Sequence, residues 1–326
     1  MALLYRPRAE SLEATKWTKA DAALIDEARI LLGPRRRPRP SVKLEESDIL
    51  EGIDLDAYAG NVRAAALREA ARLAPAASAA LDEAEFVTYG HIVVDEAQDL
   101  SPMELRVLKR RDLTGSMTIV GDMGQATTIS SSASWNSVLE VLEPRRSPSR
   151  VDLSVSYRTP QEVLDFAAPT LLAAAPDLVP PLPVRRAGSS PTVELVSADR
   201  FEATLVEATR REAKVVAPGR VAVIVTATRV DEVVDMLLRD GLDAVDPREP
   251  DGRGLGADLV VLSAEGANGL EFDATIVVEP GQIASRGSSD LTIASPRGLR
   301  TLYVAMTRPT RRLAIVACGD LPATLL

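Results

Sequence analysis

From about residue 90 onward, short apolar runs alternate with longer stretches in which apolar residues recur at helical spacing. The runs are rich in Val, Ile and Leu and end in polar turns, which is typical of strands buried on both faces of a parallel sheet. Their alternation with helices predicts an α/β fold. The predicted strands are His91–Val94, Met117–Val120, Val151–Val155, Val221–Val225, Leu259–Leu262, Thr275–Val278 and Leu313–Val316. The predicted helices lie near residues 102–110, 160–173, 200–214, 229–240 and 298–307.

The first 86 residues have a different pattern, which predicts helices and irregular segments. Thr18 and Asp21 have the spacing of a capping box, and apolar residues at helical spacing follow as far as Gly33. A second helix is expected at Val62–Leu73. The arginine- and proline-rich run at 35–40 cannot lie inside a helix, so we expect a solvated linker, with a contact to nucleic acid or an acidic partner as the alternative.

Size and composition narrow the classes of protein that fit. The chain has 326 residues, enough for about two domains. Hydrophobic residues make up 46% and charged residues 26%, which is the balance of a soluble globular protein. No apolar run approaches the roughly 20 residues that span a bilayer. The first residues do not have the pattern of a signal peptide, so we expect a cytoplasmic protein with no membrane partner.

The charge and the scarcity of metal ligands exclude several functions. A net charge of −9 argues mildly against a surface wholly devoted to nucleic-acid phosphates, although a local basic groove remains compatible with it. The single cysteine, Cys318, excludes an internal disulfide and suits a reducing cytosol. One histidine and one cysteine cannot form a zinc site. A Ser-His-Asp triad would need His91, which falls inside a predicted strand.

The strongest local signal is the segment His91–Asp99, in which an apolar strand ends in the adjacent carboxylates Asp95 and Glu96. In an open α/β sheet, ligands bind beyond the carboxyl ends of the strands. An acid at that position can hold Mg²⁺, and its neighbour can orient water for attack on a phosphate. The alternative for a bare pair of acids is an ordinary polar turn.

Four further segments have polar residues next to predicted strands or helices. Their sequences are GDMGQ at 121–125, SYRTP at 156–160, NGLEFD at 268–273 and YVAMTR at 303–308. Together with DEAQD at 95–99, they resemble motifs II to VI of superfamily 1 helicases of the UvrD/Rep group, in the family's order. Trp17 and its following acidic and leucine positions, and Ser101-Pro102-Met103, resemble the HelD-like branch of that group. The resemblance implies a P-loop NTPase with two RecA-like domains.

The resemblance also implies the catalytic residues. Asp95 would hold Mg²⁺ and Glu96 would act on the attacking water. Gln125 would sense the γ-phosphate of ATP, and Arg158 and Arg308 would contact developing phosphate charge. Arginine fingers of this kind contribute about 10³- to 10⁵-fold in rate.

The nucleotide-binding residues implied by the resemblance are Gly269, Glu271, Arg158 and Arg308, with Glu271 near the ribose. Asn268 occupies a position where the family usually has lysine. We expect the catalytic and nucleotide-binding side chains to meet in one cleft between two sheets, because each is predicted to close or follow a strand.

The predicted domains follow the motifs. A helical segment, the end of an insertion, covers 1–86. A partial RecA-like domain 1A with motifs II to IV covers 87–175. A Pro-rich linker covers 176–191, and a complete RecA-like domain 2A with motifs V and VI covers 192–326.

One element that such a motor needs is not found in the sequence. The phosphate-binding loop GxxxxGK[ST] requires a lysine after a glycine, and none of the five lysines follows one. We therefore expect this chain to be the C-terminal part of a longer motor and to be inactive alone. A sheet without the strand that precedes this loop should have exposed edges.

Three functions fit these observations. The first is an ATP-dependent helicase or translocase that remodels nucleic acid, DNA above all, or RNA polymerase. The second is a non-catalytic remnant that binds RNA polymerase or nucleic acid. The third is a RecB-type helicase–nuclease, which would need an added nuclease domain rich in carboxylates.

Overall fold

The computed structural model describes residues 10–11, 14–15, 17–32, 87–127, 134–248, 254–286, 288 and 293–326. The predicted helix at Val62–Leu73 and the arginine-rich run at 35–40 lie outside these ranges. The chain divides into two compact units. The first comprises Met1–Val94, Ser101–Ile119 and Leu139–Arg145, and the second comprises Asp95–Leu100, Val120–Val138 and Arg146–Leu326. The predicted α/β fold class is confirmed in the described residues.

The first unit contains a two-stranded parallel sheet of β1 (Ile92–Val94) and β2 (Met117–Ile119), with Ile92 opposite Met117. Helix α3 (Pro102–Arg111) begins with a capping box: the Ser101 side chain accepts from the Glu104 backbone N–H, and Glu104 accepts from the Ser101 backbone N–H. The centre of β1 is open to solvent, since 69% of Val93 is exposed. These strands agree with the sequence prediction to within one residue.

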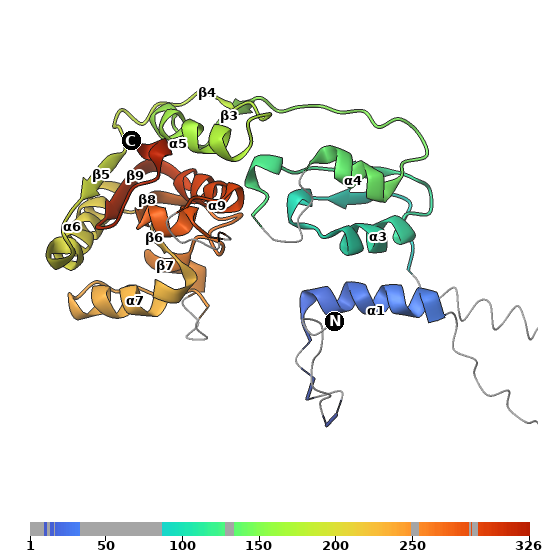
Figure 1. Cartoon of the computed structure of the whole chain (residues 1–326), viewed down its shortest axis with the longest axis horizontal. Helices are drawn as coiled ribbons and strands as arrows, with labels where there is room; N and C mark the ends of the chain where they lie inside the picture. Colours follow the sequence, from blue (N-terminus) through green and yellow to red (C-terminus); the bar gives the residue numbers. More distant parts are fainter. Residues whose placement is uncertain are drawn as a thin grey trace, which may run out of the picture. The chain divides into compact units, whose positions relative to one another are not determined.

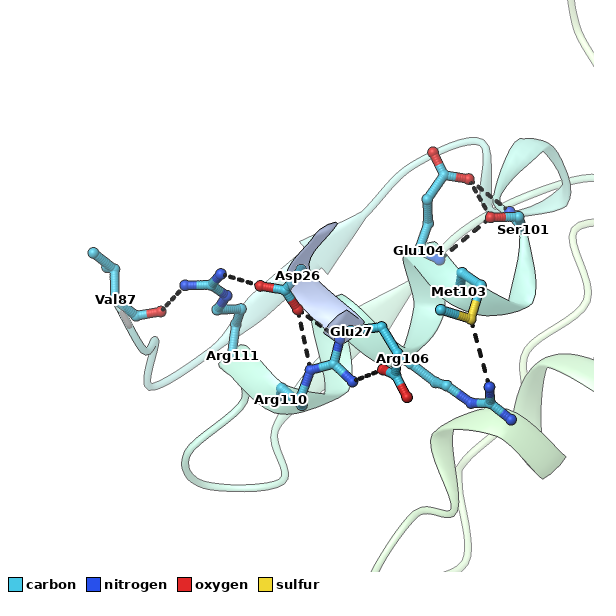
Figure 2. A network of polar contacts seen from close by, with 9 residues as sticks. All are labelled: Asp26, Glu27, Val87, Ser101, Met103, Glu104, Arg106, Arg110 and Arg111. Carbon is cyan, nitrogen blue, oxygen red and sulfur yellow. Dashed lines mark hydrogen bonds and ion pairs between the residues drawn. The ribbon is translucent and has the colours of Figure 1, made fainter. Parts of the chain in front are cut away.

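Helix α1 (Lys19–Leu32) is attached to α3 by ion pairs (Figure 2). Arg110 contacts Asp26 and Glu27, each at 2.5 Å, and Arg111 contacts Asp26 at 2.9 Å. Asp26 is largely enclosed, with 12% of its side chain exposed. The helix predicted to end before Gly33 is therefore present, and its acidic residues fix it to the basic end of α3.

The second unit contains a five-stranded parallel sheet in the order β5-β9-β8-β6-β7. Its strands are β5 (Thr192–Leu195), β6 (Val221–Val225), β7 (Leu259–Ser263), β8 (Phe272–Val278) and β9 (Pro309–Ala317). Its helices are α5 (Gln161–Ala174), α6 (Ala198–Val216), α7 (Val230–Arg239), α8 (Pro280–Ala284) and α9 (Pro296–Met306). Helix α4 (Trp135–Leu142) falls partly in each unit. None of the described helices has the length and apolarity to cross a bilayer.

The five-stranded sheet is covered on both faces (Figure 1). Alternate residues of each strand point to opposite faces. Ala222 and Ile224 of β6 therefore pack with α5, α8 and α9, whereas Val221, Val223 and Val225 pack with α6 and α7. All five residues of β6 are buried, which explains its continuous apolar sequence.

Strands β8 and β9 pair with one irregularity near their amino ends. Phe272 is opposite Pro309, but Ala274 is opposite Arg312, so β9 carries one residue more than β8 between these pairs. This is a β-bulge. Beyond it the register continues regularly to Val278 opposite Val316.

The strand predicted at Val151–Val155 is wrong in most of its length. The structure has only β3 (Val155–Ser156), which pairs in parallel with β4 (Leu182–Pro183). Val151 is 80% and Leu153 is 86% exposed. The alternation of apolar and polar residues was sufficient for a strand. The Ser154 carbonyl accepts from the Leu182 N–H of β4 at 2.7 Å, but in the described part of the chain no strand lies beside 151–153 to bury their apolar side chains.

Candidate functional site

The candidate residues lie in the second unit, on turns next to strands. Asp95 and Glu96 follow β1 in the chain, and Gln125 ends a 3-10 turn, Met123–Gln125, that follows β2. Glu271 and Arg308, however, directly precede β8 and β9. Glu271 also follows β7, as expected, but Arg308 follows helix α9, so the expectation that every candidate closes or follows a strand is wrong for Arg308. The pairing of Phe272 with Pro309 brings Glu271 and Arg308 to the same amino-terminal edge of the sheet.

Arg308 is the central cation of the site. Its Nη2 donates to the Gln125 Oε1 at 2.9 Å and its Nε donates to the Val304 carbonyl at 3.1 Å. Only 9% of the residue is exposed. The Val304 bond ties the guanidinium to the last turn of α9, so its position depends on that helix.

Burial lowers the pKa of Arg308, while the carboxylates of Glu271 and Glu96 oppose this shift. The guanidinium is therefore a poorly hydrated cation near acidic side chains. A buried cation in this setting favours the approach of an anion, because an anion replaces the hydration that burial removed. Phosphate oxygens suit the fork of an arginine well.

A continuous chain of hydrogen bonds joins Arg308 to Glu96. The Gln125 Nε2 donates to the Asp122 Oδ2 at 2.9 Å, and the Asp122 backbone N–H donates to the Gln98 Oε1 at 2.9 Å. The Gln98 Nε2 then donates to the Glu96 Oε2 at 2.6 Å. Three of the predicted catalytic residues are thus connected through Gln98 and Asp122, two residues for which no role was predicted.

The carboxylates of Asp95 and Glu96 are both exposed. Glu96 has a left-handed backbone, with φ 52° and ψ 44°, and its N–H donates to the Asp95 Oδ1 at 2.9 Å. A non-glycine residue in this conformation is strained, and such strain often occurs at functional sites. Among the described residues, no three His, Cys, Asp or Glu side chains are grouped closely enough to hold a metal ion by themselves.

Arg158 and Glu271 form an ion pair at 2.5 Å. The Arg158 side chain is 79% exposed and that of Glu271 is 41% exposed, so the pair contributes little to stability. Gly269, two residues before Glu271, has φ +74°, and no atom lies within 4 Å of the place a Cβ would occupy. This conformation favours glycine, and the space beside it is open.

Asn268, at the position where the resembled family has lysine, donates to the Asp99 Oδ2 at 2.8 Å. In a separate contact, the Arg297 Nε of α9 donates to the Thr127 carbonyl at 2.7 Å. The first contact joins the last acid of DEAQD to the start of NGLEFD. Asn268 therefore links these two segments without a positive charge.

Tyr303 of the segment YVAMTR is buried beside this chain of hydrogen bonds. Burial raises the pKa of Tyr303 to about 12, and the nearby Asp122 carboxylate adds to the shift. The phenol is therefore neutral and keeps its proton at physiological pH.

The residues that the sequence missed had weak signals. Gln98 and Asp122 belong to recognisable segments, but their residue types do not distinguish a residue that links two catalytic groups from one in an ordinary turn.

A cavity of about 360 Å³, lined by residues such as Arg106 and Glu140, belongs to the first unit and includes none of the candidate residues. The chemistry of the candidates therefore decides the assignment, and that cavity does not.

Among known proteins, the chain matches solved structures only. No family model matches the chain, and no curated protein matches it. The C-terminal domain of a possible DNA helicase from Lactobacillus plantarum WCFS1 is similar at 21% identity over 52% of this chain and 92% of that chain, with a TM-score of 0.38. The PRRSV helicase is similar at 16% identity over 71% of this chain and 37% of that chain, with a TM-score of 0.34. At such scores, neither similarity establishes a shared function.

Proposed function

We propose that this chain is part of an ATP-dependent superfamily 1 motor of the UvrD/Rep type, nearest the HelD-like branch, that acts on nucleic acid or RNA polymerase. The observation that carries the proposal is the hydrogen-bonded chain from Glu96 to Arg308. It joins segments that resemble motifs II, III and VI, and those motifs act together on nucleotide in that family. The two RecA-like domains would be a partial one at 87–175 and a complete one at 192–326.

The chemistry of the side chains fits ATP with Mg²⁺. When bound, ATP·Mg²⁺ would supply a phosphoryl group whose transfer to water releases free energy. Mg²⁺ in such sites is held by one or two carboxylates together with phosphate oxygens and water, so an isolated Asp95 is sufficient on the protein side. Arg308 offers a desolvated guanidinium and Arg158 an exposed one, both suited to phosphate.

Each residue would have one task. Glu96 would orient the attacking water and accept its proton, and Gln125 would report the presence of a terminal phosphate to Asp122. Arg308 would stabilise charge on the transferred group. Arg158 would leave Glu271 to contact phosphate, which would free the Glu271 carboxylate for the ribose hydroxyls near Gly269.

The test supplies what this sequence does not contain. The N-terminal part of a related protein, including its GxxxxGK[ST] loop, would be fused to this chain or co-expressed with it. We expect no ATP hydrolysis by the chain alone. We expect hydrolysis by the fusion that depends on Glu96 and Arg308.

The controls distinguish a real site from a contaminant. Glu96→Gln and Arg308→Ala should each abolish the hydrolysis, whereas Glu232→Gln, on the surface of α7, should leave it unchanged. A well-folded fusion that binds ATP without hydrolysing it would refute the proposal, once Asn268→Lys had been added and had made no difference.

A second function, a non-catalytic module that binds RNA polymerase or nucleic acid, is favoured by two observations. The sequence has no phosphate-binding loop, and Asn268 replaces the family's lysine. This proposal predicts that the chain alone binds RNA polymerase or DNA, with an affinity unchanged by Glu96→Gln. Loss of binding in that variant would count against it.

A further inference from the structure

Gln98 is a polar side chain with no exposure to solvent, and the proposed function gives it no task. A buried amide is costly unless both of its ends form hydrogen bonds. Both ends of Gln98 do: the Nε2 donates to Glu96, and the Oε1 accepts from the Asp122 backbone. An apolar residue would fill this space without the cost of burying an amide, so the polarity calls for a reason beyond packing.

The direction of every bond in the chain is determined by its two ends. The Glu96 carboxylate can only accept, so the NH₂ group of Gln98 must face it and the Gln98 oxygen must face Asp122. The Arg308 guanidinium can only donate, so the oxygen of Gln125 must face it and the Gln125 NH₂ group must face Asp122. Neither amide can turn over without breaking two bonds.

Asp122 connects the two amides through its backbone and its side chain. Its N–H is held by Gln98, while its Oδ1 accepts from the Gly124 N–H at 2.8 Å and its Oδ2 accepts from Gln125. A shift of Gln98 therefore moves the residue that orients Gln125. Consecutive hydrogen bonds also polarise one another, which strengthens the chain as a unit.

The residue before Asp122 leaves room for this arrangement. A Cβ on Gly121 would lie 2.6 Å from the Gln98 Oε1 and 3.0 Å from the Ala97 backbone nitrogen. Any side chain at position 121 would displace the Gln98 amide. The glycine is thus an independent observation that the backbone at 121–122 is fitted to Gln98.

From these contacts we infer that Gln98 is a positioning residue that couples the Glu96 carboxylate to the Arg308 guanidinium. It holds the direction of the Glu96 side chain and, through Asp122 and Gln125, the place of the Arg308 donor. The catalytic meaning of this coupling rests on the proposed function. The coupling itself is a property of the protein without bound nucleotide.

The test uses the full chain without nucleotide and solution NMR of its backbone amides and arginine side chains. Gln98→Met keeps the volume and removes both hydrogen bonds. We expect the Asp122 N–H to exchange with solvent about tenfold faster or more, since a part-buried donor loses its acceptor. We also expect the guanidinium signals of Arg308 to shift and exchange faster, although residue 98 and Arg308 share no hydrogen bond.

A second variant and a matched control make the result decisive. In Gly121→Ala, residue 98 is still glutamine, but the new Cβ pushes its side-chain amide aside. This variant should therefore show the same faster exchange at the Asp122 N–H and the same changes at Arg308, even if Gln98→Met does not fold. Thr170→Val is the control. Thr170 is equally buried and donates to the Thr324 Oγ1 at 2.9 Å, outside the chain of bonds, so the Arg308 signals should stay as in the unmodified protein.

The coupling is overturned if the folded Gln98 and Gly121 variants expose the Asp122 N–H yet leave the Arg308 signals unchanged. The coupling is also overturned if Thr170→Val shifts the Arg308 signals as far as the Gln98 and Gly121 variants do. Because nucleotide is absent, these outcomes are independent of whether a fusion hydrolyses ATP, so failure of the proposed function and failure of the coupling can be told apart.

Discussion

Replacing Glu212 of α6 with glutamine should destabilise the second unit strongly. The Glu212 side chain is 1% exposed and lies between two arginines. Its Oε2 accepts from the Arg312 Nε at 2.5 Å, and its Oε1 accepts from the Arg211 Nε at 3.2 Å. These contacts join α6 to β9. Glu212→Gln keeps the size of the side chain and removes the charge.

The magnitude follows from the partners that remain. Arg211 keeps Glu194 at 2.7 Å, whereas among the described residues Arg312 keeps only the Ser189 hydroxyl at 3.2 Å. Removing one member of a buried pair costs about 3–5 kcal/mol, because the other charge is left without its counterion. The Arg312 side chain is 22% exposed, so water can replace part of that interaction. We expect a loss of about 2–4 kcal/mol in the free energy of unfolding.

The pH dependence gives a second measure of the same interaction. Burial raises the pKa of Glu212, but the hydrogen bonds and charges of Arg312 and Arg211 outweigh it and hold the pKa below its usual range. The stabilisation is therefore complete above the pKa of an unfolded glutamate, about 4.3, and is lost as the pH falls through the lower folded value. The difference between the unmodified protein and Glu212→Gln should shrink below about pH 4.

The assay is urea denaturation followed by circular dichroism, at pH 7 and at decreasing pH. Glu232→Gln is the control: Glu232 of α7 pairs with Arg229, the residue before that helix, and is 54% exposed, so the loss should be below about 1 kcal/mol. A loss at Glu212→Gln no larger than that of the control, or one that stays constant with pH, would refute the reasoning.

Three further predictions concern the site and the first unit. In an active fusion, Arg308→Ala should lower the hydrolysis rate by about 10³- to 10⁵-fold in a rapid-mixing assay, and a loss below tenfold would remove Arg308 from the reaction. Gly121→Ala should cost about 1–3 kcal/mol by thermal unfolding because its Cβ would overlap the Gln98 amide, whereas Gly256→Ala, with open space around it, should cost far less. Arg110→Ala should increase hydrogen exchange in α1 by about tenfold, since Arg110 makes two of its ion pairs; unchanged exchange would show that α1 is held otherwise.

Much of the fold could be predicted because β6 and β7 of the second unit are apolar over nearly their whole length, whereas β5, with the sequence TVEL, was missed. The strand Val221–Val225 was predicted with its observed ends. The strand at Leu313–Val316 was predicted too short, since β9 runs from Pro309 to Ala317. Its first residues include arginines, which hide a strand from a search for apolar runs. The reverse error occurred at Val151–Val155, where the pattern was present and the neighbouring strand was not.

The candidate site was predictable as a set of residues but not as a set of contacts. The segment patterns give Glu96, Gln125 and Arg308, yet the bonds among them depend on Gln98, whose role comes from burial on all sides. No local pattern reveals that environment. The position of Arg308 directly before β9 was also not predicted. The sequence indicates that a strand is near, but it does not indicate at which end of the strands a ligand would bind.

The bulge in β9 divides the strand into a part that pairs regularly with β8 and a short part next to Arg308. On its far side, the register with β8 is held by buried side chains on both faces. On its near side lie Pro309 and Arg308. Because side chains alternate with a period of two, deleting the surplus residue would change the alignment with β8 of everything before it. That part includes Arg308 and the end of α9, whose Leu302 and Met306 belong to the core. The surplus residue therefore reconciles the regular register of β9 with the packing of α9 and the contact of Arg308 with Gln125.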